Sequence, residues 1–218
     1  MSLSPTQQAC LRGLYAVTPD DPLLPRMSAL VNEALAGGVK VVQYRNKFAP
    51  PPLFRAQAAE LLRICRAAGA LLIVNDNPEI VADIGADGVH VGREDGGAAR
   101  ARAIVGPDRI VGVSCYDDLS IAAEAVAAGA DYIAFGAMFP STVKPGAVAA
   151  PLSLLTEART RFKVPVCAIG GIKLDNVQSL IDAGTDMAAV ITDLFDAQDI
   201  AAQAGAYQEL FKVSVSRA

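Results

Sequence analysis

Short, continuously apolar runs recur along this chain, and polar side chains follow them. Continuous rather than alternating hydrophobicity is typical of β-strands that are covered on both faces. A small-residue phrase precedes several runs, such as Gly-Ala-Asp at 85–87 and Ala-Gly-Ala-Asp at 128–131. The runs that we predict as strands are Leu14–Thr18, Val39–Gln43, Leu71–Asn75, Gly88–Val91, Ile110–Ser114, Tyr132–Gly136, Val166–Ile169 and Ala188–Thr192.

Helical patterns fill the intervals between these runs. Pro52 and Pro151 fit first-turn positions of helices, and glycines at 37, 69, 129 and 184 fit helix C-terminal caps. The segments predicted to be helical are Met27–Ala36, Pro52–Ala68, Pro78–Ile84, Ala98–Val105, Ile121–Ala128, Pro151–Arg161, Asn176–Ala183 and Ile200–Phe211.

Eight strands that alternate with eight helices favour an α/β fold, a closed TIM (β/α)₈ barrel. We expect one domain over residues 1–218, because no linker or shift in composition divides the chain. A doubly wound open sheet is the alternative, since periodicity alone does not show that the sheet closes. In a barrel, the polar ends of the strands would form an active site.

The overall composition limits the classes of partner. A net charge of −4 argues against nucleic acid or an anionic membrane as the main partner, so small molecules are expected. No dinucleotide-binding or P-loop signature is present. The four cysteines form no Cys-x-x-Cys pair and are predicted to be reduced thiols. Without a signal-peptide pattern, we expect a cytoplasmic protein.

Cationic side chains follow the second predicted strand. Gln43, Arg45 and Lys47 alternate as the chain leaves a buried run, so their side chains can point the same way. Arginine offers a planar fork for phosphate oxygens and lysine a mobile point charge. A strand end with ordinary solvated charges is the structural alternative.

Carboxylates follow the third and fourth strands, which are neighbours in a barrel. Asp76 and Asp95 together suit a hard cation such as Mg²⁺, which keeps several waters and takes one or two carboxylates plus substrate phosphates. Glu94 is a less certain neighbour. Alternatively, Asp76 caps the helix that begins at Pro78, and Asp95 is a plain loop residue.

The only histidine, His90, lies inside an apolar strand and is predicted to be packed and hydrogen-bonded within the barrel. Ser114 ends the fifth strand, where it either contacts a substrate or caps local backbone. Because the single histidine is assigned to the barrel interior and no second one is present, we do not expect a Ser-His-acid hydrolase.

Loops with small or apolar residues follow the last two strands, where backbone N–H groups can contact a ligand. Gly170-Gly171 follows the seventh, and Ile191-Thr192 ends the eighth. In barrels of this kind these two loops often bind phosphate through backbone N–H groups, and glycine lets the backbone approach an anion closely. A tight turn is the alternative reading of the glycine pair.

Six motifs occur in a fixed order from about Gly13 to Thr192: Gln43–Lys47, Asn75-Asp76, Ala86–Gly92 with Glu94-Asp95, Gly112–Ser114, Phe139–Lys144 and Ala168–Ile172. Together they resemble the motifs of the thiamine-phosphate synthase family, although each alone would be weak. The resemblance implies a transferase that joins a hydroxymethylpyrimidine diphosphate to a hydroxyethylthiazole phosphate. The products are thiamine phosphate and diphosphate, and the family's mechanism is dissociative.

The resemblance also implies a role for each matching residue. The leaving diphosphate would be held by Arg45, Lys47 and Lys144, which with Ser114 form the implied catalytic set. The metal would be Mg²⁺, held by Asp76 and Asp95. The other implied substrate contacts are Gln43, Asn75 and Ser114 for the pyrimidine, Ser141 and Val143 in the sixth loop, and Gly171, Ile191 and Thr192 for the thiazole phosphate.

Two positions depart from the family's pattern. The sixth loop usually reads Pro-Thr-x-Thr-Lys, whereas here Ser141 keeps the first hydroxyl and Val143 loses the second. Tyr116 stands two residues after Ser114, where many relatives carry histidine. The alternatives are a relative of the thiazole tautomerases, a Schiff-base aldolase using Lys47 or Lys144, or a non-catalytic sensor of a phosphate ligand.

Overall fold

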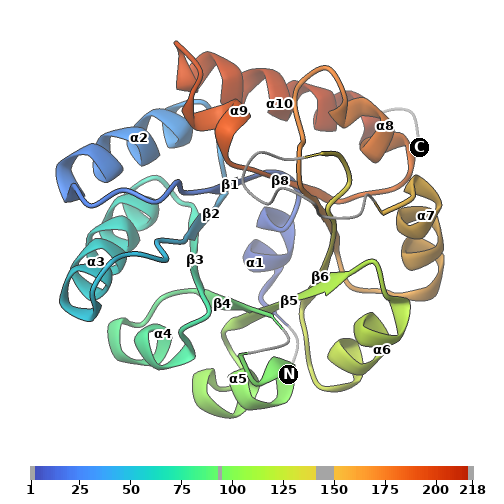
Figure 1. The fold of residues 1–218 in the computed structure, drawn as a ribbon, viewed down its shortest axis with the longest axis horizontal. Helices are drawn as coiled ribbons and strands as arrows, with labels where there is room; N and C mark the ends of the chain where they lie inside the picture. The colour runs from blue at the N-terminus through green and yellow to red at the C-terminus, as the bar shows by residue number, and fades with distance from the viewer. Residues whose placement is uncertain (1–2, 93–94, 141–149, 216–218) are drawn as a thin grey trace.

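Eight parallel strands close into a barrel in sequence order, with β8 pairing back onto β1 (Figure 1). The structure is a computed structural model and describes residues 3–92, 95–140 and 150–215. The closed barrel confirms the predicted TIM fold and rules out the open sheet. The strands are β1 (Gly13–Val17), β2 (Val41–Tyr44), β3 (Leu71–Asn75), β4 (Gly88–Val91), β5 (Ile110–Tyr116), β6 (Tyr132–Phe135), β7 (Val166–Ile169) and β8 (Met187–Val190).

Helices surround the barrel, and each of the eight predicted helices is present, Pro78–Ile84 with the predicted bounds and the others with shifted ends (Figure 1). The sequence did not predict two short helices, α1 before the first strand and α9 after the last. The helices are α1 (Pro5–Cys10), α2 (Leu24–Ala36), α3 (Pro51–Ala67), α4 (Pro78–Ile84), α5 (Gly97–Val105), α6 (Leu119–Ala127), α7 (Leu152–Arg161), α8 (Val177–Asp182), α9 (Thr192–Phe195) and α10 (Ile200–Val215).

The end of the eighth strand was predicted two residues too late. Ile191 has φ −113° and ψ −86°, which leaves the extended region, and Thr192 already begins α9. The apolar character of Ile191 reflects packing against the barrel interior rather than strand pairing.

The aspartate that ends the small-residue phrase before several strands has a structural role. The carboxylate of Asp87 accepts a hydrogen bond from Leu72 N at 2.9 Å, at the start of the preceding strand β3. Asp131 accepts from Val111 N in the same way at 2.8 Å, and Asp186 from Val166 N at 2.9 Å. Each aspartate therefore ties the beginning of one strand to that of its neighbour, at the end of the barrel opposite the predicted site.

The hydrophobic core has two parts. The larger part lies between the strands and the outer helices, and the smaller part fills the barrel interior. Helix α1 lies across the ring of strands in Figure 1, and Leu11, at its end, is only 2% exposed within the interior cluster. Because apolar residues fill this end, polar chemistry is confined to the carboxyl ends of the strands.

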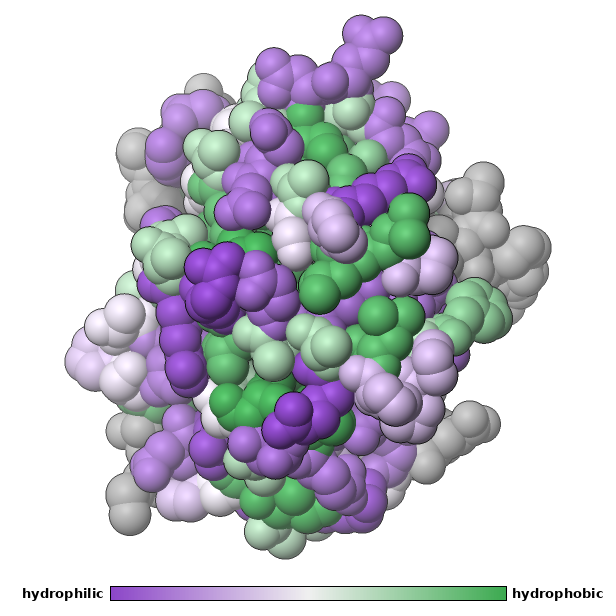
Figure 2. Space-filling view, turned by 90° about the vertical axis from the view of Figure 1, so that its left-hand side faces the viewer, coloured by the Kyte–Doolittle hydropathy of each residue, from purple (hydrophilic) through white to green (hydrophobic). Residues whose placement is uncertain are grey.

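The outer surface is mixed in character. Figure 2 shows hydrophilic side chains interleaved with smaller hydrophobic areas on the side that carries α2 and α3. Across the described ranges, no helix combines the length and the hydrophobicity that a membrane crossing requires.

Candidate active site

The carboxyl ends of the parallel strands bring the predicted site residues to one end of the barrel. Gln43 lies on β2, Asn75 ends β3 and Ser114 lies near the end of β5. Gly171 follows β7, and Ile191 follows β8. The strand register alone thus places all five at the barrel mouth, as expected for this fold.

Arg45 is held from both its backbone and its side chain. Its N–H donates to Thr18 Oγ1 at 2.9 Å, and the same hydroxyl donates back to Arg45 O at 2.9 Å. Its Nη1 donates to Asp20 Oδ2 at 3.1 Å, and its side chain is only 16% exposed. A partly buried, anchored guanidinium loses little conformational freedom when its remaining N–H groups bind an anion.

Asp20 was not singled out from the sequence, yet it connects both predicted cations. Its second oxygen accepts Lys47 N at 2.6 Å, so one carboxylate fixes the side chain of Arg45 and the backbone of Lys47. The sequence did show that Asp20 closely follows a predicted strand, which could have marked it as a site residue. Its partner Arg45, however, comes from the loop after a different strand, and no local pattern links the two.

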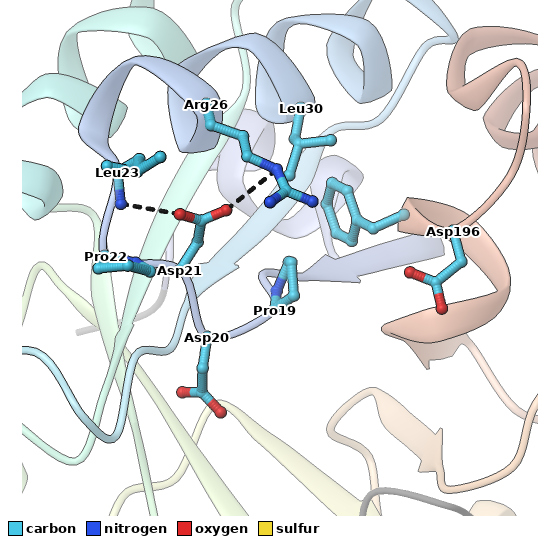
Figure 3. A pocket seen from close by; sticks show the side chains of 9 residues that line it. Pro19, Asp20, Asp21, Pro22, Leu23, Arg26, Leu30 and Asp196 are labelled. Carbon is cyan, nitrogen blue, oxygen red and sulfur yellow. Dashed lines mark hydrogen bonds and ion pairs between the residues drawn. The ribbon is translucent and has the colours of Figure 1, made fainter.

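The neighbouring Asp21 serves a different structure. Figure 3 shows Asp21 turned toward Leu23 and Arg26, with Asp20 pointing away from that pair. Asp21 accepts Leu23 N at 2.7 Å and pairs with Arg26 at 3.2 Å. A cavity of about 200 Å³ lies here, lined by residues 19–23, Arg26, Leu30, Phe195 and Asp196.

Asp76 and Asp95 converge as predicted for a cation site. Burial and the adjoining Asp95 carboxylate, which is within hydrogen-bonding reach, raise the pKa of Asp76 to about 6; the Lys47 charge and the Asn75 amide act in the opposite direction. Asp76 also has φ +62°, a left-handed conformation that is uncommon for a residue other than glycine and often marks functional sites. The alternative that Asp76 caps α4 is wrong, since Asn77 occupies that position.

The carboxylate pair fits a hard cation. Asp95 Oδ2 accepts Gly92 N at 2.7 Å, which holds the loop after β4 against the third-strand tip. Two adjacent carboxylates repel each other, and a divalent ion bound between them removes that repulsion. Across the described ranges no group of three or more His, Cys, Asp or Glu side chains could hold a metal, so further ligands would come from water or substrate.

Gln43, His90 and Ser114 belong to one buried hydrogen-bonded group. His90 Nε2 lies 2.8 Å from Ser114 Oγ, and Gln43 Nε2 donates to the Tyr15 hydroxyl at 2.8 Å. Burial lowers the pKa of His90 to about 4, so the imidazole is neutral at physiological pH. The prediction that His90 is packed and hydrogen-bonded in the barrel is confirmed.

The glycine after β7 lies against the start of the sixth loop. A Cβ on Gly171 would come within 2.3 Å of Pro140 O and 2.7 Å of Phe139 O, and its φ is +61°. Phe139 N donates to Gly170 O at 3.0 Å, which joins the two loops directly. The close approach explains why this position carries no side chain, and it leaves phosphate binding by these loops a prediction.

Four expected residues lie outside the described part of the chain. They are Glu94 in the loop after β4, and Ser141, Val143 and Lys144 in the loop after β6. The implied contact of Lys144 with the diphosphate and the implied substrate contacts of Ser141 and Val143 therefore stay predictions. Thr192 is described and lies exposed at the start of α9, beside Ile191.

Comparisons with known proteins identify the family. The family model described as thiamine monophosphate synthase matches residues 14–194. The chain is 52% identical to the thiamine-phosphate synthase of Azoarcus sp. (strain BH72), over 92% of this chain and 98% of the relative. It is 53% identical to that of Chromobacterium violaceum, over 90% and 94%.

A solved structure agrees with these relatives. Thiamine phosphate pyrophosphorylase from Pyrococcus furiosus superposes with a TM-score of 0.84 at 32% identity, covering 94% of this chain and 98% of that one. The family model, over residues 14–194, spans the strands of the barrel from Leu14 in β1 to the end of β8. The chain belongs to the thiamine monophosphate synthase family.

Proposed function

We propose that this protein is a Mg²⁺-dependent transferase that makes thiamine phosphate from a hydroxymethylpyrimidine diphosphate and a hydroxyethylthiazole phosphate. The C–O bond to the diphosphate breaks, its electron pair leaves with the diphosphate, and the thiazole nitrogen lone pair forms the new C–N bond. Family membership supports the overall reaction. The roles of single residues and of the metal rest on the site itself.

The observation that carries the mechanism is the pairing of anchored cations with two converging carboxylates. Arg45 and Lys47 are held by Asp20, while the Lys47 charge also acts on Asp76 beside Asp95. Cations and a carboxylate-bound metal within one cluster suit the stabilisation of charge on a departing diphosphate.

Asp76 and Asp95 would hold the metal ion, whose chemistry is to neutralise the charge that develops on the leaving diphosphate. Arg45 would bind phosphate oxygens from a fixed position, because its backbone and guanidinium are both anchored. Lys47, exposed on the same loop, would follow the diphosphate as it leaves.

No strong general base is required by this reaction, because the attacking thiazole nitrogen carries no proton. The neutral, buried state of His90 agrees with that requirement, since its two nitrogens already have partners. Gln43 and Ser114 would instead orient the pyrimidine, and Gly171, Ile191 and Thr192 would line the site of the thiazole phosphate. Binding of small molecules agrees with the net charge of −4, since the chain has no excess of basic residues.

One assay tests the proposal. Purified protein is mixed with both substrates and Mg²⁺, and thiamine phosphate and diphosphate are measured together. Equal amounts of the two products are expected, with loss of activity on chelation and recovery with Mg²⁺. Conversion of the thiazole phosphate alone would favour a tautomerase, and its binding without diphosphate release would favour a sensor.

Two lysines that flank the same strand provide a matched pair of variants. Lys47 follows β2 at the barrel mouth, whereas Lys40 precedes the same strand at the opposite end. Lys47→Ala is expected to lower kcat/KM by about tenfold or more, which corresponds to about 1.4 kcal/mol of transition-state stabilisation. Lys40→Ala should leave it unchanged, and equal effects would contradict the assignment of Lys47.

A further inference from the structure

A line of five hydrogen-bonded side chains crosses the barrel interior and joins two predicted substrate contacts. It begins at Gln43 on β2 and ends at Ser114 on β5. Its four contacts are Gln43 Nε2 to Tyr15 Oη at 2.8 Å, Tyr15 Oη to Tyr132 Oη at 2.8 Å, Tyr132 Oη to His90 Nδ1 at 2.9 Å, and His90 Nε2 to Ser114 Oγ at 2.8 Å.

The three inner members are sealed from solvent. Tyr15 is 1% exposed, Tyr132 is fully buried and His90 is 7% exposed. Among the described residues, the hydrogen bonds of these three side chains go only to the two neighbours in the line. Each inner group must therefore find its donor and its acceptor within the line, because an unmet hydrogen bond in the interior is unfavourable.

Counting protons then fixes the sense of every hydrogen bond. Each phenol has one proton, and a neutral imidazole carries one N–H. Because the Gln43 amide nitrogen donates to Tyr15, the Tyr15 proton has only Tyr132 to go to. The Tyr132 proton must then go to the next member of the line, the imidazole.

The same proton count determines which atoms of His90 and Ser114 carry a proton that can be donated. His90 Nδ1 accepts from Tyr132, so the single imidazole proton sits on Nε2 and is donated to Ser114 Oγ. The serine hydroxyl proton is not needed within the line and can be donated elsewhere. At the other end, one N–H of the Gln43 amide is committed to Tyr15, which fixes the orientation of the amide and leaves its oxygen available as an acceptor beside the second N–H.

We propose that Tyr15, Tyr132 and His90 are positioning residues that set the hydrogen-bonding sense of the pyrimidine site, with Gln43 as acceptor and Ser114 as donor. The proposal rests on the proposed function for the identity of the ligand. The matching ligand is a heteroaromatic ring with an amine that donates to Gln43 and a ring nitrogen that accepts from Ser114. An oxo group in place of the amine would face another acceptor.

The test reads the proton on His90 directly. His90 is the only histidine in the chain, so untagged protein labelled with ¹⁵N-histidine gives imidazole signals from this residue alone. Two-bond ¹H–¹⁵N spectra report which ring nitrogen carries the proton. We expect the proton on Nε2 in the wild-type protein, and a proton on Nδ1 would overturn the proposal.

A distant substitution should move that proton. In Gln43→Glu the ionised carboxylate cannot donate, so Tyr15 must donate to it and every hydrogen bond in the line reverses. Spectra from pH 7 to 9 allow for a raised pKa of a buried glutamate. We expect the His90 proton to transfer to Nδ1, although Gln43 does not touch His90. An Nε2 proton that persists at pH 9 would refute the inference.

The matched control breaks the line without removing the new charge. In Tyr132→Phe, the Gln43→Glu substitution should leave the His90 proton where it is, because the connection is missing; Tyr15→Phe serves if Tyr132→Phe does not fold. Transfer that still occurs would show an effect of charge alone and overturn the proposal. The spectra need no turnover, so they are independent of the synthase assay, whose failure would instead refute the proposed function.

Discussion

Replacement of His90 by glutamine should remove a specific pH dependence from the stability of this protein. Burial lowers the pKa of His90 to about 4 in the folded state, from an ordinary value of 6.5. Below pH 6.5 the unfolded chain takes up a proton that the folded chain cannot take until the pH approaches 4. The stability associated with neutral His90 is therefore complete above pH 6.5 and is lost as the pH falls toward 4.

The magnitude follows from the size of the shift. One pKa unit corresponds to about 1.4 kcal/mol, so the folding free energy of the wild-type protein should lose about 2 kcal/mol from this group between pH 7.5 and 5.0, and about 3 kcal/mol by pH 4. Glutamine has one acceptor and one donor to replace the contacts with Tyr132 and Ser114, but it does not titrate. His90→Gln should lack this loss.

Urea unfolding at a series of pH values measures the effect, because urea leaves electrostatic interactions unscreened. The chain has no tryptophan, so far-UV circular dichroism is the suitable signal. The raised pKa of Asp76 has the opposite effect on stability. Its carboxylate takes up a proton in the folded protein near pH 6, before the unfolded chain does, so this group stabilises the fold as the pH falls. Only the difference between wild type and His90→Gln therefore isolates the histidine.

A second variant separates titration from hydrogen bonding. His90→Leu removes both contacts and should be less stable than His90→Gln at pH 7.5, yet show the same weak pH dependence. If the wild-type protein and His90→Gln lost equal free energy between pH 7.5 and 5.0, the histidine would not be the neutral buried group that the structure indicates.

Two further predictions concern the loops at the barrel mouth. Asp20→Ala should raise the KM for the pyrimidine diphosphate about tenfold in steady-state assays, because it removes charge-assisted contacts to Arg45 and to the Lys47 backbone; an unchanged KM would show that the anchoring does not matter. Gly171→Ala should raise the KM for the thiazole phosphate more than that for the pyrimidine diphosphate, since the new methyl group overlaps backbone of the sixth loop. Gly184→Ala is its control, with a positive φ but no backbone overlap, and equal kinetic defects in the two variants would contradict the interpretation.

The order of elements was readable from the sequence because it depends on short-range pattern. Each predicted strand and helix has its counterpart, and polar residues follow the strands at the end where chemistry occurs. The end of the eighth strand was predicted wrongly because a residue can be apolar and partly buried without pairing in the sheet. Ile191 is such a residue: it packs against the barrel interior but is no longer extended. The short helix α1 was missed although Ser4 and Gln7 form a capping box, because the segment is only six residues long.

Closure and side-chain pairing were decided by the tertiary structure. The pairing of Leu14 with Ala188 closes the barrel across almost the whole chain, and no local pattern encodes it. The pairing of β1 with β2 brings Asp20 to Arg45, which anchors a cation at the barrel mouth. The pairing of β3 with β4 places the Asp95 loop against Asp76, where burial and repulsion raise the pKa of Asp76.

The sequence by itself determined which residues could do chemistry, and the resemblance of its ordered motifs determined the family. Residue type and spacing act over a few positions, so they suffice for strands, caps and candidate ligands. The direction of the hydrogen bonds from Gln43 to Ser114 depends on five side chains from five strands, and the contact of Tyr15 on β1 with Tyr132 on β6 joins strands that are not neighbours in the barrel. Only the folded structure could determine that order.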